Sequence, residues 1–357
     1  MTAAVAFANP SLRARRLPKW APGAVGVGSV ALSFLLFYVG GLLGGGLTLT
    51  VIAALVLFVI AISIVSRAIE GPRAARNRVV TTLIYAACVV AAVPLVEVVY
   101  TLIHKGLERF DVTFFTHSNR NITAFDSQGG AYHAIVGTLQ QAGIATLISV
   151  PLGILGAIYI VEYGRGRLAS TIRFFVDVMT GIPSIVAGLF ILSFWVLVVS
   201  PHFSATGLPS FSGFAAALAL SVLMLPTVTR STEEMLRLVP DSLREGSYAL
   251  GIAKWKTIVK IVLPTATTGI VTGVMLAVAR ACGETAPVLL VAGANDSINF
   301  NPFKGSQDSL ATYIYKQASL ASPYGPPRAW TAALTLVALV LILTVAAKLI
   351  ARRNKLK

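Results

Sequence analysis

Two charged residues, Arg280 and Glu284, stand four positions apart in a stretch of the chain that is otherwise apolar. A charge near the middle of a bilayer costs about 2.5 to 3.5 kcal/mol for arginine on insertion scales, so it normally faces a partner or a pathway. Residues at i and i+4 share one face of a helix, and we expect the carboxylate to pair with the guanidinium. The pair is either a structural ion pair that holds two helices together or a site that recognises an anion.

The second interpretation follows from the shapes and charges of the two groups. A guanidinium offers a planar fork of N–H donors that matches a tetrahedral oxyanion. A carboxylate beside it accepts a hydrogen bond from a protonated oxyanion such as phosphate and repels a fully ionised one such as sulfate. Gly283 and Pro287 flank the pair and favour a local break in the helix, where polar backbone groups line a cavity.

A second group of residues lies in the connection 230–264, which we expect to form short helices. Ser242 and Glu245 stand three apart after Pro240, which predicts a capping box at the start of a helix. Gly251 permits a bend after it. Apolar residues recur on one face with helical spacing, at Tyr248, Ile252, Trp255, Val259 and Val262. Such a ridge lies either on acidic lipid or in the groove of a soluble partner.

The same connection carries Glu245, Gly251, Ile261, Leu263 and Pro264 at a fixed spacing. This pattern resembles the EAA loop of ABC importer permeases, E-A-A-x3-G-x9-I-x-L-P, whose short helix fits a cleft on the ATP-hydrolysing subunit. Two small residues replace the alanines of the motif, and the glycine among them weakens a helix by about 1 kcal/mol relative to alanine. The residues that the resemblance assigns to ATPase coupling are Glu245, Gly246, Ser247, Gly251, Ile261, Leu263 and Pro264.

The elements that position these residues are membrane-spanning helices. The chain of 357 residues is 56% hydrophobic and 12% charged, whereas soluble proteins have about 25% charged residues. Apolar stretches of roughly 20 residues are long enough to cross the hydrocarbon core as helices, and they lack the alternation of a transmembrane barrel. We therefore expect an all-α polytopic membrane protein with eight helices, near residues 24–44, 47–66, 79–103, 134–161, 173–199, 212–229, 268–292 and 329–350.

The position of the basic residues predicts the orientation of the chain. The net charge is +15, and most Lys and Arg residues fall in the N-terminal tail, in every second connection and from Lys348 onward. This pattern predicts that both termini lie in the cytoplasm. It indicates that the positive charge reflects the orientation of a membrane protein and not the binding of a nucleic acid. The opposite side carries Lys105, Arg109, Arg120, Lys304, Lys316 and Arg328.

Other features of the sequence narrow the kind of protein. Cys88 and Cys282 both fall inside apolar spans, which supports neither a disulfide framework nor a metal site. The chain has no G-x-x-x-x-G-K-[ST] phosphate loop, so we expect no cofactor and no catalytic residue here, with ATP and Mg bound by a separate ATPase. The outer loops 104–133 and 293–328 are long enough to receive a partner, to act as lids or to be plain Ω-like loops.

A narrower resemblance covers residues 79–350, which include six of the eight spans. The segments DVMTGIPSIVAGLF (177–190), LPTVTRSTEEML (225–236), LREGSYALGIAKWKTI (243–258) and ARACGETAPVLL (279–290) resemble phosphate ABC importer permeases of the PstA type. This implies a type I permease fold with a six-helix core in 79–357, to which 1–78 adds a cytoplasmic tail and an extra transmembrane hairpin.

The same resemblance implies a function and a set of partners. The expected partners are a homologous permease of the PstC type, an ATPase dimer of the PstB type, an extracytoplasmic phosphate-binding protein of the PstS type, phosphate and membrane lipid. Arg280 and Glu284 would then act in substrate translocation across the bacterial inner membrane.

Two alternatives remain open from the sequence, together with several weaker candidate residues. The chain is a permease for another oxyanion, such as molybdate or sulfate, or an ion-coupled secondary transporter in which Arg280 and Glu284 relay ions. The second alternative leaves the motif in 230–264 unexplained. Weaker candidates, for which a structural role is the simpler prediction, are Glu97, Asp177, Pro183, Arg230, Glu233 and Glu234.

Overall fold

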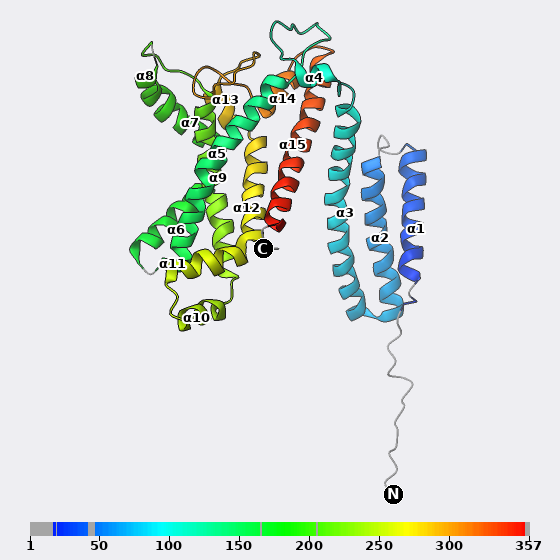
Figure 1. Ribbon diagram of the computed structural model, residues 1–357. Helices are drawn as coiled ribbons and strands as arrows, with labels where there is room; N and C mark the ends of the chain where they lie inside the picture. The colour runs from blue at the N-terminus through cyan, green and yellow to red at the C-terminus, as the bar shows by residue number, and fades with distance from the viewer. Residues whose placement is uncertain (1–16, 19, 42–46, 165, 205, 354–357) are drawn as a thin grey trace. The chain divides into compact units, whose positions relative to one another are not determined.

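The computed structural model describes residues 17–18, 20–41, 47–164, 166–204 and 206–353, and these are helical with no strand (Figure 1). The chain divides into two compact units, Met1–Thr101 and Leu102–Lys357. The basic residues of the predicted N-terminal tail and most of the glycine-rich connection after the first helix lie outside the described residues.

The first unit contains an antiparallel helical hairpin. Its elements are α1 (Ala21–Ser33) with the π-helical turn η2 (Phe34–Val39), α2 (Leu47–Glu70) and most of α3 (Pro72–Gly106). The backbone N–H of Leu17, before α1, donates to Glu70 Oε1 at the end of α2 at 2.7 Å. Ser33 Oγ, at the other end of α1, donates to the carbonyl of Thr50 near the start of α2 at 2.6 Å. These two bonds fix the direction of α1 against α2.

The second unit is a larger helical bundle. Its elements are α4 (Val112–Thr116), α5 (Tyr132–Ile158), η4 (Tyr159–Tyr163), α6 (Arg167–Thr180), α7 (Ser184–Ile191), η5 (Leu192–Val199), α8 (Ser200–Phe203), α9 (Gly213–Arg237), α10 (Asp241–Ala249), α11 (Lys254–Thr257), η6 (Ile258–Val262), α12 (Leu263–Gly283), α13 (Ala286–Ala292), α14 (Leu310–Ala318) and α15 (Gly325–Arg353). Within this unit α10 and α11 lie at one end, and α4 and α14 lie at the opposite end (Figure 1).

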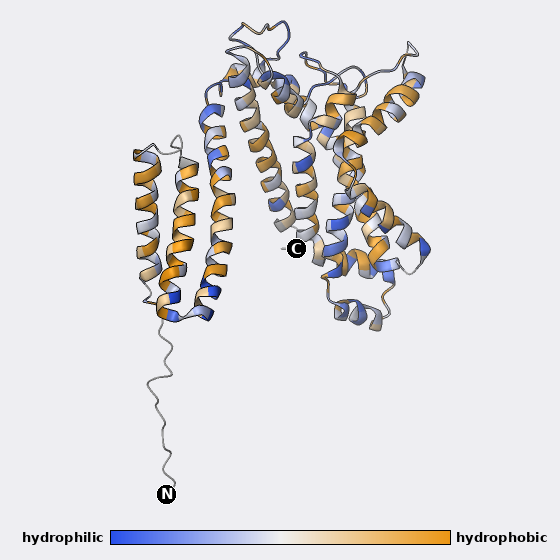
Figure 2. Cartoon of the chain, turned by 180° about the vertical axis from the view of Figure 1, so that it is seen from behind, coloured by the Kyte–Doolittle hydropathy of each residue, from blue (hydrophilic) through white to orange (hydrophobic). Residues whose placement is uncertain are grey.

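Eight helices of the described residues are long and apolar enough to cross a bilayer, as predicted. In both units the long helices are mostly apolar, and polar residues gather toward their ends (Figure 2). The fifth span differs from the prediction of 173–199, because it runs over Ser184–Phe203. Gly181, Ile182 and Pro183 separate α6 from α7, and Pro183 has no N–H with which to continue α6.

The connection predicted for residues 230–264 also differs from the prediction. The helix expected to end at residue 229 continues to Arg237, so the connection starts within α9. The predicted capping box is wrong, because α10 begins at Asp241 with Pro240 at its N-cap and without a side-chain capping bond. The φ of Pro240, −61°, is fixed by its ring and presets the turn into the helix, so Ser242 falls inside α10.

The core of the second unit lies among α5, α9, α12 and α13, and small side chains bring these helices together. A β-carbon on Gly153 of α5 would lie 2.8 Å from Val228 Cγ1 of α9. Membrane helices associate through such close contacts because lipid gives them no hydrophobic driving force. Four alanines of α9 are completely buried in this core, Ala215, Ala216, Ala217 and Ala219.

The helix α12 packs against α9 in the same way. A β-carbon on Gly269 would lie 2.0 Å from Met235 Sδ, and one on Gly273 would lie 2.3 Å from Ser231 Oγ. The sequence pattern Gly269, Gly273, Ala277 and Ala281 predicts this close approach of a neighbouring helix, and the prediction is confirmed.

Gly137→Ala is expected to destabilise the second unit. A β-carbon at Gly137 on α5 would lie 1.9 Å from the carbonyl oxygen of Asp308, and backbone cannot yield as a side chain does. Overpacking of this kind costs typically 1–3 kcal/mol, so thermal unfolding in detergent should begin several degrees lower, by roughly 5 °C. Gly143→Ala on the same helix is the matched control, because no atom lies within 4 Å of a β-carbon there. Equal melting temperatures for the two variants would contradict this packing.

Candidate functional site

The candidate translocation residues lie where α12 ends and α13 begins. Gly283 is the last residue of α12, and Glu284 adopts an extended conformation with φ −73° and ψ 121°. Thr285 then leads into α13, with Pro287 in its first turn. A β-carbon on Gly188 of α7 would lie 2.7 Å from Pro287 Cα, so α7 packs directly against the start of α13. The break suggested by Gly283 and Pro287 is therefore present.

Arg280 and Glu284 form a pair, but across the end of the helix rather than along one helical face. Arg280 Nε donates to Glu284 Oε1 at 3.3 Å. The Arg280 side chain is 64% exposed and that of Glu284 is 17% exposed. Among the described residues, the Nη donors of Arg280 make no hydrogen bond. The guanidinium is thus oriented by one bond, and its donor fork stays open.

Glu284 lines a small cavity inside the bundle, whose surface is mostly apolar. The cavity is lined by Thr138 and Gln141 of α5, by Ser309 before α14, and by apolar residues of α9 and α12. The carboxylate therefore lies between the exposed guanidinium and the interior of the bundle.

Sequence reasoning missed a buried polar network at the α14 end of the unit. Gln307 Nε2 donates to Gln140 Oε1 at 2.5 Å and to the carbonyl of Asn299 at 2.9 Å. The N–H of Leu310 donates to Thr138 Oγ1 at 2.8 Å. These bonds attach the 293–328 segment to α5, so this segment is ordered against the bundle.

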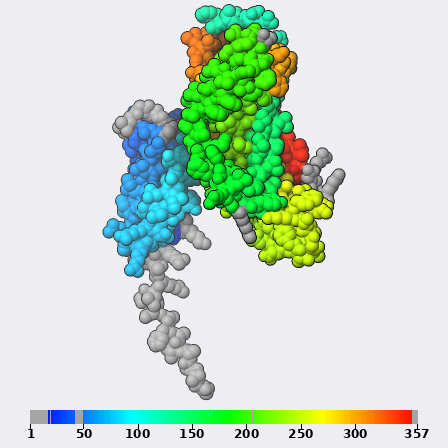
Figure 3. Space-filling view, turned by 90° about the vertical axis from the view of Figure 1, so that its left-hand side faces the viewer, coloured from blue at the N-terminus to red at the C-terminus, as the bar shows by residue number. Residues whose placement is uncertain are grey.

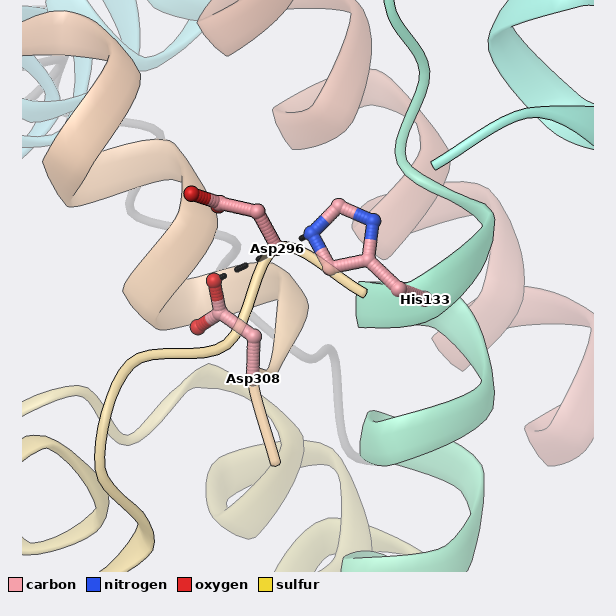
Figure 4. A group of neighbouring side chains, drawn as sticks. All are labelled: His133, Asp296 and Asp308. Atoms are coloured by element: carbon pink, nitrogen blue, oxygen red, sulfur yellow. Dashed lines mark ion pairs between the residues drawn. The ribbon is translucent and has the colours of Figure 1, made fainter. Parts of the chain in front are cut away.

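Three residues of this region, His133, Asp296 and Asp308, have ligand atoms within 4.8 Å of one another, as a metal site would (Figure 4). The Nζ of Lys316, however, lies 2.9 Å from Asp296 Oδ1 and 2.8 Å from Asp308 Oδ2. Its ammonium already bridges the two carboxylates, so a divalent cation would have to displace a charge that the protein supplies. Among the described residues, both ring nitrogens of His133 lack a hydrogen-bond partner, and Nε2 lies 4.0 Å from Asp308 Oδ2.

The charges around Lys316 keep it protonated. Burial alone would lower its pKa, but the charge of Asp308 and hydrogen bonds to Asp308 and Asp296 together raise the pKa above its ordinary value. A raised pKa in the folded state means that this stabilisation is complete at pH values below the ordinary lysine pKa. It is lost only as the pH rises through the raised value. The ion pairs are therefore intact throughout the physiological range.

Lys316→Met is expected to destabilise the fold by on the order of 3 kcal/mol, because it leaves the buried Asp308 carboxylate without its cation. The measurement is thermal unfolding of the detergent-purified protein at neutral pH. Lys304→Met, on the same segment but at an exposed lysine with no ion pair among the described residues, is the matched control. Similar melting temperatures for both variants would show that the Lys316 pairs are not stabilising.

The segment before α5 is also held in place, by two arginines. Arg328, which is 1% exposed, donates to the carbonyls of Asp126 and Gln128. Arg109 donates to the carbonyls of Ser127 and Gly129. The two guanidiniums thus share four consecutive carbonyl groups between them. We call residues 126–129, with these contacts, the clamped loop.

The predicted coupling residues lie on α10 and on the segment that leads into α12. Glu245 and Gly246 are exposed, Ser247 is buried, and Gly251 has φ +72°, which permits the predicted bend. The last three residues of the motif follow where η6 leads into α12: Ile261 and Leu263 are half-buried and Pro264 is exposed.

The apolar ridge of this segment is exposed over most of its length. Tyr248, Ile252, Trp255 and Val259 are 40%, 36%, 58% and 55% exposed, whereas Val262 is buried where η6 joins the bundle. The segment forms a lobe at one end of the second unit, coloured yellow in the space-filling view (Figure 3). An exposed apolar ridge of this kind needs either lipid or a partner to cover it.

An ion-pair network joins α6 to the end of α9 that leads to α10. The buried carboxylate of Glu233 lies 2.6 Å from Arg237 and 3.4 Å from Arg173 of α6. Arg230 lies 3.3 Å from Asp177. Asp177, Arg230 and Glu233 thus connect two helices, which agrees with the simpler prediction of a structural role.

A family profile described as "Binding-protein-dependent transport system inner membrane component" matches residues 149–356. The chain belongs to this family. The phosphate transport system permease protein PstA 1 of Mycobacterium tuberculosis strain H37Rv is 47% identical over 290 residues, which cover 80% of this chain and 91% of that protein. PstA of Mycobacterium leprae is 47% identical, and the alignment covers 78% of this chain and 89% of that protein. PstA of Haemophilus influenzae is 36% identical, and the alignment covers 79% of this chain and 96% of that protein.

Solved structures agree with the fold of this family. A bacterial ABC transporter that imports the acidic polysaccharide alginate superposes with a TM-score of 0.55, and its complex with a pentasaccharide-bound periplasmic protein with 0.57. Both alignments are 16% identical and cover 78% of this chain and 96% of the solved chain. The family and the eight spans together make this a multi-pass protein of the bacterial inner membrane, with an ABC importer permease fold.

Proposed function

We propose that this chain is the permease subunit of an ATP-driven phosphate importer and forms half of the translocation path. The observation that carries the proposal is the Arg280 guanidinium, held at a helix break by one bond to Glu284 with its Nη donors open. Its chemistry suits a tetrahedral oxyanion, and the curated relatives are phosphate transport permeases.

Glu284 supports selection among oxyanions. A carboxylate in the position of Glu284 accepts a hydrogen bond from a protonated phosphate, whereas it repels sulfate, which carries no proton at neutral pH. Phosphate uptake should therefore resist competition by sulfate. A permease for molybdate or sulfate is the alternative, and competition experiments separate it from the proposal.

The second half of the proposal is the source of energy. A separate ATPase subunit, which binds ATP and Mg, docks on α10 and α11, where Glu245, Gly246 and the apolar ridge are exposed. Residues 245–251 and 261–264 transmit its movement to α12. This arrangement requires α10 and α11 to face the cytoplasm, as the distribution of basic residues predicts. Covalent chemistry is left to that ATPase.

The remaining proposed partners are a second permease subunit and a phosphate-binding protein. Arg280 is largely exposed, so a homologous permease subunit would complete its surroundings and supply the rest of the path. An extracytoplasmic phosphate-binding protein would deliver the substrate at the end that bears α4 and α14.

The test is uptake of radiolabelled phosphate by cells that lack this chain, with and without its gene on a plasmid, and with sulfate uptake as the control. Restored phosphate uptake that requires ATP and persists after the proton gradient is collapsed supports the proposal. Uptake that disappears with the ion gradient while ATP is maintained would favour an ion-coupled transporter instead.

A further inference from the structure

Arg244 on α10 makes five hydrogen bonds, one for each N–H donor of its guanidinium. Nε and Nη2 both donate to Glu162 Oε1, at 3.1 and 3.0 Å. Nη2 also donates to the carbonyl of Leu236 at 2.9 Å. Nη1 donates to the carbonyl of Val239 at 2.6 Å and to Asp241 Oδ1 at 3.1 Å. A lysine, with three donors at a single point, would not reproduce this set.

The acceptors of these bonds belong to different parts of the bundle. Glu162 lies on η4, the direct continuation of α5, and Leu236 lies on the last turn of α9. The side chains of Arg244 and Glu162 are only 12% and 5% exposed, so water competes little for the bonds. One side chain of α10 therefore holds the ends of two long helices.

A second set of contacts makes α10 and α11 a compact hairpin on the same support. Ser247 and Thr257 share a buried hydroxyl–hydroxyl hydrogen bond of 2.7 Å. Lys254 donates to the carbonyl of Glu162, and its Nζ lies 4.6 Å from the centroid of the Tyr163 ring. Both helices of the hairpin thus contact η4.

The two supported helices lead toward the candidate translocation pair. α5 and α9 pack closely along their lengths, with Gly153 against Val228. At the other end of α5, Thr138 and Gln141 line the small cavity that Glu284 also lines. Packed helices move as rigid bodies, so a displacement at η4 would reach the surroundings of Glu284.

We propose that Arg244 is a positioning residue for energy coupling, which joins α10 to α5 and α9 so that a push on α10 moves both helices together. This inference rests on the proposed function as an ATP-driven importer. Without the Arg244 bonds, α10 would be connected to η4, among the described residues, only through α11 and Lys254, so less of the movement of the ATPase would reach α5 and α9.

The test uses the complete importer, purified with its partner subunits and reconstituted in proteoliposomes, where phosphate uptake and ATP hydrolysis are measured on the same sample. Arg244→Met removes all five donors and keeps an unbranched side chain. We expect the ATPase to stay bound and to hydrolyse ATP within about twofold of the wild-type rate, because the exposed docking residues are unchanged. The phosphate transported per ATP should fall at least about tenfold. Arg244→Lys should recover only part of this loss.

Two further variants separate coupling from stability. Glu162→Gln removes the charge of the acceptor but keeps its shape, and it should lower the phosphate transported per ATP about threefold. Arg237→Met is the matched control, because Arg237 pairs with Glu233 inside α9 and does not reach η4. It should keep the wild-type ratio.

If Arg244→Met transports as much phosphate per ATP as the wild type, the inference is overturned and Arg244 has a purely stabilising role. This includes the case in which uptake and hydrolysis both fall by the same factor. If Arg244→Met does not assemble, Glu162→Gln decides by the same ratio. Failure of the wild-type importer to transport phosphate would contradict the proposed function instead, so the two failures are distinguishable.

Discussion

Arg280→Gln is expected to lower phosphate uptake about 100-fold while the importer complex stays assembled. Glutamine keeps an unbranched polar side chain, although a shorter one, and removes the charge and the donor fork. Two charge-assisted hydrogen bonds to an anion, at about 1.5–3 kcal/mol each, account for a loss of this size. The Arg280 side chain is 64% exposed and makes one hydrogen bond among the described residues, so its replacement disturbs little packing.

The measurement compares initial uptake rates in cells that express equal amounts of each variant, together with copurification of the partner subunits. Arg73→Gln, at an exposed arginine of the first unit, is the control for a general loss of positive charge. Wild-type uptake by Arg280→Gln would return Arg280 and Glu284 to a structural ion pair while leaving the family and fold intact.

Leu250→Asp is expected to weaken binding of the ATPase subunit at least about 30-fold. Leu250 is 80% exposed at the end of α10, beside the Gly251 bend, so the change leaves the fold of the chain intact. Leu250 lies between the ridge residues Tyr248 and Ile252 in sequence, and a charge that an apolar contact buries costs about 2 kcal/mol or more in binding.

Affinity is measured by titrating the purified ATPase against the permease in nanodiscs. Leu250→Met is the matched control, because it keeps an apolar side chain of similar size, and it should bind as the wild type does. Equal affinity of the Leu250→Asp and wild-type permeases would place the docking surface elsewhere and remove the coupling role from α10.

The parts of the fold that were predicted correctly are those set by local composition. A run of some 20 apolar residues has few alternatives to a membrane helix, and eight such helices are present. The small residues Gly269 and Gly273 also predicted a close helix contact from local sequence, because a glycine has no side chain to keep a neighbouring helix away.

The errors arose where a proline or a tertiary contact overrides the pattern of apolar and capping residues. Residues 173–199 look like one apolar span, but Arg173 and Asp177 pair with α9, and the chain breaks before Pro183. At Ser242, the proline two residues earlier set the helix start, and the hydroxyl had no part in it.

The candidate site was predicted only in part, because its residues come from distant positions. The spacing of Arg280 and Glu284 identified the pair, although the helix ends between them. No local pattern connects His133 with Asp308, or Glu162 with Arg244, since about 80 residues or more separate the two members of each pair. Their signal in sequence is weak: each is a charged or polar residue at the edge of an apolar helix. The assignments of substrate and coupling residues, and the cytoplasmic position of the termini, stay predictions.

The clamped loop bears on how fast a second protein can land on the α4 end of the second unit. A loop that has to fold during an encounter loses conformational entropy at that moment, and this slows productive collisions as well as weakening the complex. In residues 126–129 the backbone carbonyls are already occupied by Arg109 and Arg328. A protein that binds there meets a surface that is already ordered. Its association rate is then governed by diffusion and by the mutual orientation of the two proteins.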